Sequence, residues 1–180
     1  SALDGAELVK GSHVPALPEF DMAKLSAVEP ANLSQQLDDG KAIVVDFADS
    51  LTYRAGHIPT ARWTARSRIH QLIGFLPPAE TYVATAPDED LARLAASEMM
   101  KLTSTPIAYL KGGNAAWTDA GLSQVTGVEF AVGSVDDVYE RPYDREKGVE
   151  EAMNLYLDWE IELVNQIERD GTLNLPHFAP

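Results

Sequence analysis

The residues best placed for chemistry form one short polar loop. The loop runs from the end of a predicted strand into a predicted helix and consists of Thr85, Ala86, Pro87, Asp88, Glu89 and Asp90. Three consecutive carboxylates could bind a divalent cation, because such ions prefer oxygen ligands. The same acids could begin a helix, with Asp88 as N-cap and the next two near the positive end of the helix dipole. No matching cluster of histidines or acids is visible elsewhere, so we expect the helix start and no metal site.

Covalent chemistry finds little support in this chain. The hydroxyl of Thr85 would need a general base or an N-terminal amine to become a nucleophile, and no such group is suggested by position. The 180 residues include no cysteine, which excludes thiolate nucleophiles, disulfides and thiolate metal sites. No pattern for a cofactor is found. The sequence therefore predicts no catalytic residue.

The elements around the loop indicate an α/β fold. Three runs rich in β-branched and apolar residues predict strands at 42–47, 81–85 and 106–110. Between the last two, residues 88–101 carry apolar side chains at helical spacing. Strand, helix and strand joined by short links predict a parallel crossover. The loop would then lie at the carboxyl end of a strand in a parallel sheet.

The two ends of the chain differ from this middle part. Residues 1–28 are read as a linker or N-terminal arm, with a weak helix at 21–25, and a short helix follows at 30–37. Residues 149–169 predict one long helix with a broad apolar face, ended by Gly171. Such a helix is too apolar to stand alone in water. We expect it to pack on the α/β domain or on a partner.

The composition limits the partners of the chain. A formal net charge of −14 and a pI near 4.5 argue against nucleic acid or an anionic membrane as a partner. No apolar run approaches the ~18 residues of a membrane-spanning helix. The start, Ser1-Ala2-Leu3, shows neither an initiator methionine nor the apolar core of a signal peptide. We expect a cytoplasmic fragment of a longer protein; its oligomeric state is not predicted.

Two motifs in the middle of the chain resemble the rhodanese (thiosulfate sulfurtransferase) family. The first joins Asp46-Phe47-Ala48 to residues 53–61, which read Tyr-Arg-Ala-Gly-His-Ile-Pro-Thr-Ala. The second spans Leu110 to Leu122 and contains Gly-Gly followed by tryptophan. The resemblance implies a rhodanese-like three-layer domain, with a central parallel sheet flanked by helices, at 29–126. Residues 1–28 then form the arm, and 127–180 form an extension that contains the long C-terminal helix.

The resemblance assigns architectural roles to the signature residues, which are Asp46, Gly56, His57, Gly112, Gly113 and Trp117. We expect Gly56 to permit a positive φ or a close approach, and His57 to donate a hydrogen bond to Asp46. The paired glycines would let the chain leave a strand sharply, with Trp117 packed beneath that turn.

Several departures from the family pattern concern its active site. Ala48 stands where relatives usually carry arginine, and Thr60 where they carry glycine. The position of the catalytic cysteine, which carries the persulfide, falls on Thr85 or Ala86. Pro87 removes a backbone N–H from the loop, and the following acids would repel an anionic substrate. The resemblance therefore implies a degenerate active-site loop at 85–90.

The C-terminal part resembles the tail of larger bacterial proteins that contain several rhodanese modules. This implies an inactive module that supports sulfur transfer by an active module of the same protein, so its partners would be other rhodanese modules. Two alternatives remain open: a stand-alone binding or regulatory domain, and a different enzyme that reuses the loop pocket.

Overall fold

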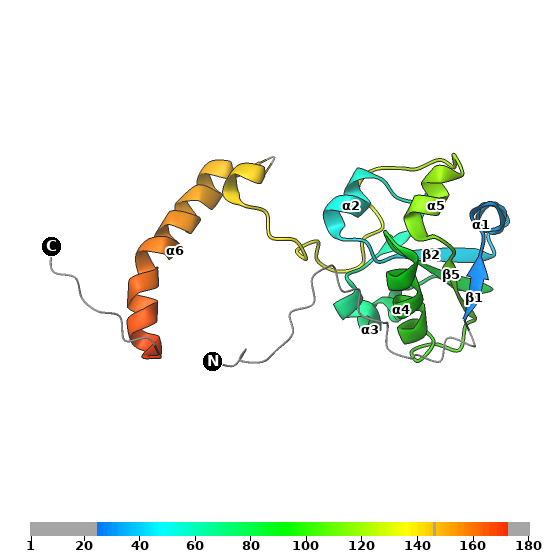
Figure 1. Cartoon of the computed structure of the whole chain (residues 1–180), viewed down its shortest axis with the longest axis horizontal. Helices are drawn as coiled ribbons and strands as arrows, with labels where there is room; N and C mark the ends of the chain where they lie inside the picture. Colours follow the sequence, from blue (N-terminus) through cyan, green and yellow to red (C-terminus); the bar gives the residue numbers. More distant parts are fainter. Residues whose placement is uncertain (1–24, 146, 173–180) are drawn as a thin grey trace, which may run out of the picture. The chain divides into compact units, whose positions relative to one another are not determined.

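The computed structural model describes residues 25–145 and 147–172 (Figure 1). The chain divides into two compact units, one ending at Asp137 and one beginning at Val138. Each unit is considered by itself below.

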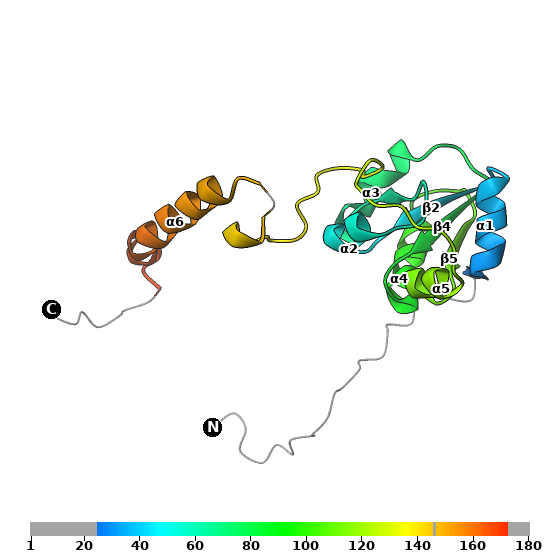
Figure 2. The same ribbon diagram turned by 90° about the horizontal axis from the view of Figure 1, so that it is seen from above.

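The first unit contains one five-stranded parallel sheet. Its strands lie in the order β1-β5-β4-β2-β3, with bounds Ser26–Val28, Ile107–Leu110, Thr81–Thr85, Ala42–Asp46 and Arg62–Trp63. Figure 2 shows β2, β4 and β5 side by side. The three strands predicted from β-branched runs are confirmed, and all of them lie inside the sheet, where both faces are buried.

Helices cover both faces of this sheet. Helices α1, α2 and α5 pack on one face and α3 and α4 on the other, with bounds Pro30–Asp38, Ser50–Ala55, Gly113–Asp119, Ile69–Leu72 and Glu89–Met99. Figure 1 shows α2 and α5 above the strands and α3 and α4 below them. Short 3₁₀ turns at Arg66–Arg68 and Ile73–Phe75 flank α3. The predicted α/β fold with helices on both sides of a parallel sheet is confirmed.

The first strand corrects the prediction for the N-terminal arm. Residues 26–28, predicted as part of a linker, pair with β5 as edge strand β1. Three residues carry no periodic signal, and the pairing partner lies some 80 positions away in the sequence, so local patterns could not find this strand. The weak helix predicted at 21–25 lies almost wholly outside the described residues.

The first unit continues past residue 126, where the rhodanese-like domain was predicted to end. Val125 forms an antiparallel bridge with His57, and Phe130 accepts a hydrogen bond from the backbone of Trp63. Arg68 then binds the carbonyl of Ser134 and the carboxylate of Asp136. Residues up to Asp137 therefore belong to the same compact unit.

Thr60 is the one non-glycine residue of the described chain with a positive φ, 65°. The side chain is exposed. A β-branched residue is strained in this region by about 1–3 kcal/mol. We expect Thr60→Gly to raise the free energy of unfolding by about 1 kcal/mol in urea titrations, net of the entropy that glycine adds to the unfolded chain.

Thr126→Gly is the matched control, because Thr126 is also exposed but has an ordinary backbone conformation. This substitution should lower the free energy of unfolding by about 0.5–1 kcal/mol. Equal losses at the two positions would show that Thr60 is not strained.

The second unit holds a 3₁₀ turn at Pro142–Asp144 and the long helix α6, Val149–Asp170. The predicted helix at 149–169 is thus confirmed to within one residue. Gly171 ends it in the left-handed conformation, with its N–H bonded to the carbonyl of Ile167. Neither α6 nor any other helix in the described part of the chain is both long and apolar enough to cross a membrane.

Candidate functional site

Three polar side chains meet where β2 and β4 end. Asp46 and Thr85 are register partners at the carboxyl ends of these two strands, and both are fully buried. Asn114, in the first turn of α5, lies between them. Its Nδ2 donates to Asp46 Oδ2 at 3.0 Å, and its Oδ1 accepts from Thr85 Oγ1 at 2.6 Å. The side-chain amide of Asn114 therefore links Asp46 and Thr85 to the second motif, residues 110–122.

Burial dominates the electrostatics of Asp46. Removal from water raises the pKa of this carboxyl to about 6, although hydrogen bonds from the Ala48 N–H and from Asn114 act in the opposite direction. The nearby charge of Asp49 raises the pKa further. Both carboxyl oxygens of Asp46 are thus occupied by protein donors. These two hydrogen bonds tie the end of β2 to the residues that follow it and to α5.

The loop after β4 is packed tightly against α5. Ala86 is fully buried, and its carbonyl accepts from the Asn114 N–H at 2.8 Å. A Cβ on Gly113 would come within 2.6 Å of that carbonyl oxygen and 3.0 Å of the Asp88 carbonyl carbon. Gly113 has a φ of +63°, so both its conformation and its lack of a side chain are needed. This explains the second of the paired glycines in the second motif.

The three acids of the loop act as a helix start. Asp88 Oδ1 accepts from the Leu91 N–H at 2.9 Å, which confirms the predicted N-cap of α4. Glu89 Oε2 accepts from the Gly112 N–H at 2.8 Å and so ties this helix to the turn before α5. Asp90 lies 3.7 Å from Arg93. Within residues 25–145 and 147–172, no group of three or more acids and histidines could hold a metal ion.

The predicted contact of His57 with Asp46 is wrong. The Nδ1 of His57 lies 2.8 Å from the carbonyl oxygen of Tyr53, and the two rings stack with centroids 3.7 Å apart. Helix α2 ends at Ala55, two residues before His57, so the ring meets a free carbonyl of the last turn of this helix. The imidazole is buried, and its role is to fix the turn that follows α2.

Of the two roles expected for Gly56, the structure supports the close approach. Its φ is 178°, which is ordinary extended backbone. A Cβ there would lie 3.2 Å from Oε1 of Gln124. That neighbour is the end of a flexible side chain, so the constraint on Gly56 is mild.

Two tryptophans fix the backbone near the site. Trp63 is fully buried and donates from Nε1 to the carbonyl of Ala48 at 2.8 Å. Trp117 is buried as predicted, and its Nε1 donates to the carbonyl of Ser123 at 3.0 Å. Ala48, which stands where the resemblance implies an arginine, is itself buried and carries no charge to the site.

The arrangement provides structure but no activated nucleophile. Thr85 donates its hydroxyl proton to an amide oxygen, which is not a base at neutral pH. Asn114 separates this hydroxyl from the carboxyl of Asp46. Sequence reasoning did not single out Asn114, whose signal was only its place after the paired glycines. Asp46, Thr85 and Ala86 bond to Asn114 directly, and Gly113, Asp88 and Glu89 pack or bond at the same turn.

Comparisons with known proteins agree with this geometry. A family model described as Rhodanese-like domain matches residues 29–120. A thiosulfate sulfurtransferase from Pseudomonas aeruginosa of known structure is 36% identical, with a TM-score of 0.79. The match covers 91% of this chain but only 31% of that one, so this chain spans about a third of the length of that protein. No match was found among curated proteins.

Shorter relatives share the fold alone. A rhodanese-related protein from Thermoplasma volcanium is 17% identical with a TM-score of 0.51, and the match covers 57% of this chain and 99% of that one. A protein from Bacillus halodurans is 22% identical with a TM-score of 0.52, covering 66% of this chain and 85% of that one. Since the family model matches half of the chain and the sheet, loop and glycine turn follow its motifs, this chain belongs to the rhodanese-like domain family.

Proposed function

We propose that this chain is a catalytically inactive rhodanese-like module that supports thiosulfate sulfur transfer by an active module of the same longer protein. The single observation that carries the proposal is the absence of cysteine from a chain that is 36% identical to a thiosulfate sulfurtransferase. The similarity extends over 91% of this chain and 31% of that protein, which leaves room for another module to perform the reaction.

The loop geometry supports inactivity for a second reason. A persulfide carrier needs a thiolate that attacks sulfur, holds it and releases it, and the surrounding backbone N–H groups stabilise its negative charge. Here Thr85 and Ala86 are buried, and Pro87 has no N–H to offer. The carboxylates of Asp88 and Glu89 take up N–H groups that could otherwise bind an anion. The loop thus offers no thiolate, and it has fewer N–H groups available for an anionic intermediate.

The direct test is the transfer of sulfur from thiosulfate to cyanide by the purified chain. We expect thiocyanate formation at the rate of the uncatalysed reaction, and no covalent sulfur on the chain by intact-mass measurement after exposure to a sulfane donor. Turnover above background, or a mass gain of one sulfur atom, would refute inactivity. The supporting role is tested separately, by assaying the full polypeptide encoded by the gene with and without residues 25–172.

Restoring the missing sulfur atom alone should not restore activity. We expect Thr85→Cys and Ala86→Cys to remain at least ~100-fold below an active sulfurtransferase, since Pro87 offers no N–H and the carboxylates of Asp88 and Glu89 already accept two of the N–H groups that could stabilise the charged intermediate. Burial beside Asp46 should also keep the new thiol protonated at neutral pH. Thiol titration with Ellman's reagent across pH, alongside the cyanide assay, measures both effects. Substantial turnover by either variant would show that only the cysteine is missing.

A stand-alone binding or regulatory domain is the second candidate. It is favoured by the large apolar side chains that α6 exposes, including Leu155, Ile161 and Val164. A gene that encodes no cysteine-bearing rhodanese module beside this one would favour this candidate over the first.

A further inference from the structure

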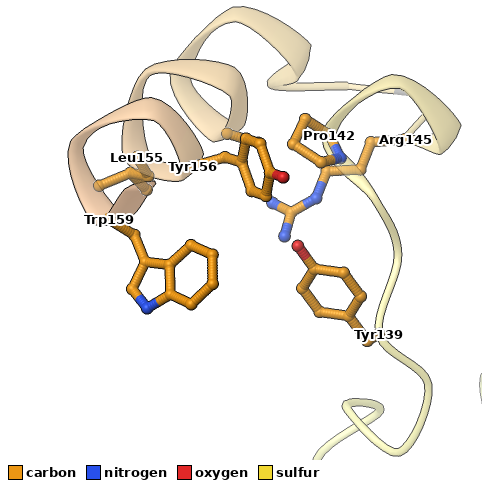
Figure 3. Close-up of a pocket in the computed structure, with 7 residues that line it drawn as sticks. Tyr139, Pro142, Arg145, Leu155, Tyr156 and Trp159 are labelled. Atoms are coloured by element: carbon orange, nitrogen blue, oxygen red, sulfur yellow. The ribbon is translucent and has the colours of Figure 1, made fainter. Parts of the chain in front are cut away.

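The second unit contains a pocket of about 600 Å³ built by the 3₁₀ turn and the first half of α6. Figure 3 shows the rings of Tyr139, Tyr156 and Trp159 and the guanidinium of Arg145 around a common space. Buried Pro142 and Ala152 form part of its lining. Three aromatic rings with one cation suit a ligand that is apolar on one side and negatively charged on the other.

The cation in this pocket has no anion to bind among the described residues. Arg145 is exposed and makes no hydrogen bond or ion pair with any described residue. Two acids of this unit have other partners: Asp144 is bound by Arg141 at 2.6 Å, and Glu160 accepts a hydrogen bond from the hydroxyl of Tyr156. In a chain with a net charge of −14, an arginine that has no acidic partner among the described residues and lies beside aromatic rings can accept a carboxylate from a ligand.

The pocket lies in the unit that exposes more large apolar side chains in the described part of the chain. Nine large apolar side chains of the described second unit are at least about one-third exposed, against four in the described first unit. In the second unit these include Leu155 at 64%, Trp159 at 49% and Ile161 at 76%. Clusters of this kind on one short segment mark an interaction site.

The comparisons indicate which kind of protein carries such a surface. The match to the Pseudomonas aeruginosa sulfurtransferase covers 91% of this chain, so it must extend well into residues 138–180. The Thermoplasma volcanium relative is matched over 99% of its length by only 57% of this chain. The whole of that protein therefore corresponds to little more than half of this chain. The second unit thus accompanies the rhodanese-like fold in a protein about three times as long as this chain.

We propose that the pocket binds a segment of a neighbouring module of the same longer polypeptide. That segment places an apolar side chain between Tyr156 and Trp159 and a carboxylate against Arg145. The inference rests on the proposed function and adds to it the surface through which this module holds its partner.

Photo-crosslinking in the intact polypeptide encoded by the gene tests this contact. The photoreactive residue p-benzoylphenylalanine replaces Trp159 in the pocket, or Tyr143 as the control. Tyr143 lies in the same unit and is 62% exposed, but it does not line the pocket. We expect position 159 to cross-link to a peptide of another module, with at least tenfold higher yield than position 143. Arg145→Glu should reduce that yield at least fivefold, and Arg145→Lys should preserve most of it.

Each of the other possible outcomes would refute the proposed contact between this pocket and another module. Cross-links to residues 25–137 would mean that the first unit of this chain covers the pocket, and cross-linked dimers would mean that a second copy does. No cross-link from position 159 would mean that the pocket stays open to solvent. The proposed function is judged independently, by a mass gain of one sulfur atom on a cysteine of the other module after exposure to thiosulfate. That gain can persist when the contact is refuted, so the two failures are distinguishable.

Discussion

Gly113→Ala is expected to lower the free energy of unfolding of the rhodanese-like unit by about 3 kcal/mol, the sum of a strained φ and an overpacked contact. The residue has a φ of +63°, and a Cβ would lie 2.6 Å from the carbonyl oxygen of Ala86. That oxygen is held by the Asn114 N–H, so it cannot move away without breaking a buried hydrogen bond. Urea unfolding followed by fluorescence of the buried Trp63 and Trp117 measures the loss.

Gly40→Ala separates the two contributions. Gly40 has a similar φ of +68°, but a Cβ there meets nothing within 4 Å. This variant should lose only the conformational part, about 1–2 kcal/mol. Equal losses at the two positions would show that the loop after β4 yields freely, and that the close approach of Gly113 to Ala86 contributes nothing to stability.

Asp46 should make the stability of the unit depend on pH between about 4 and 6. Its pKa is about 6 in the folded chain, because of burial, against 3.8 for an exposed carboxyl. In this range the folded state keeps a proton that the unfolded state has lost, so stability falls as pH rises. Asp46→Asn removes this dependence, and the stability of the wild type relative to this variant should fall by about 2 kcal/mol from pH 4 to pH 7.

The asparagine variant should keep the local hydrogen bonds. Its amide oxygen can accept from the Ala48 N–H, and its amide nitrogen can donate to Asn114 once that side chain is flipped. The flipped amide of Asn114 then donates to Thr85 Oγ1.

Asp49→Asn is a control of opposite sign. Burial raises the pKa of Asp49, but hydrogen bonds from Thr52 outweigh this and lower the pKa below its ordinary value. The stability of the wild type relative to this variant should rise as pH increases through that lowered pKa. The prediction for Asp46 would be refuted if the wild type gained stability relative to Asp46→Asn as the pH rises. That result would mean that the folded chain stabilises the carboxylate form of Asp46.

The parts of the fold that the sequence predicted are those with strong local signals. Residues 42–46 and 81–85 are continuous buried runs, and Asp88 precedes an apolar helical stripe, so strand and cap followed from neighbouring residues. Strand β1 has only three residues and gains its stability from a partner distant in the sequence. Such pairing leaves no local pattern.

The candidate site shows the same limit. Asn114 bonds to Asp46 and Thr85, which lie 68 and 29 positions away, and only the tertiary fold brings them together. For His57 the error was of the opposite kind. A distant partner was expected, but the short helix α2 supplies the Tyr53 carbonyl four residues earlier. Resemblance identified Asp46 and the paired glycines, and the structure was needed to find Asn114 and the partner of His57.

The two outermost strands have a consequence for the behaviour of the chain at high concentration. A sheet edge with unpaired N–H and C=O groups is a template for further chains and hence for aggregation. Here β1 offers only three residues, and β3 only two, with Trp63 further bridged by Ala131. Neither edge strand is long enough to nucleate intermolecular β-structure. The sheet of the first unit should therefore provide little template for fibril formation in a concentrated solution.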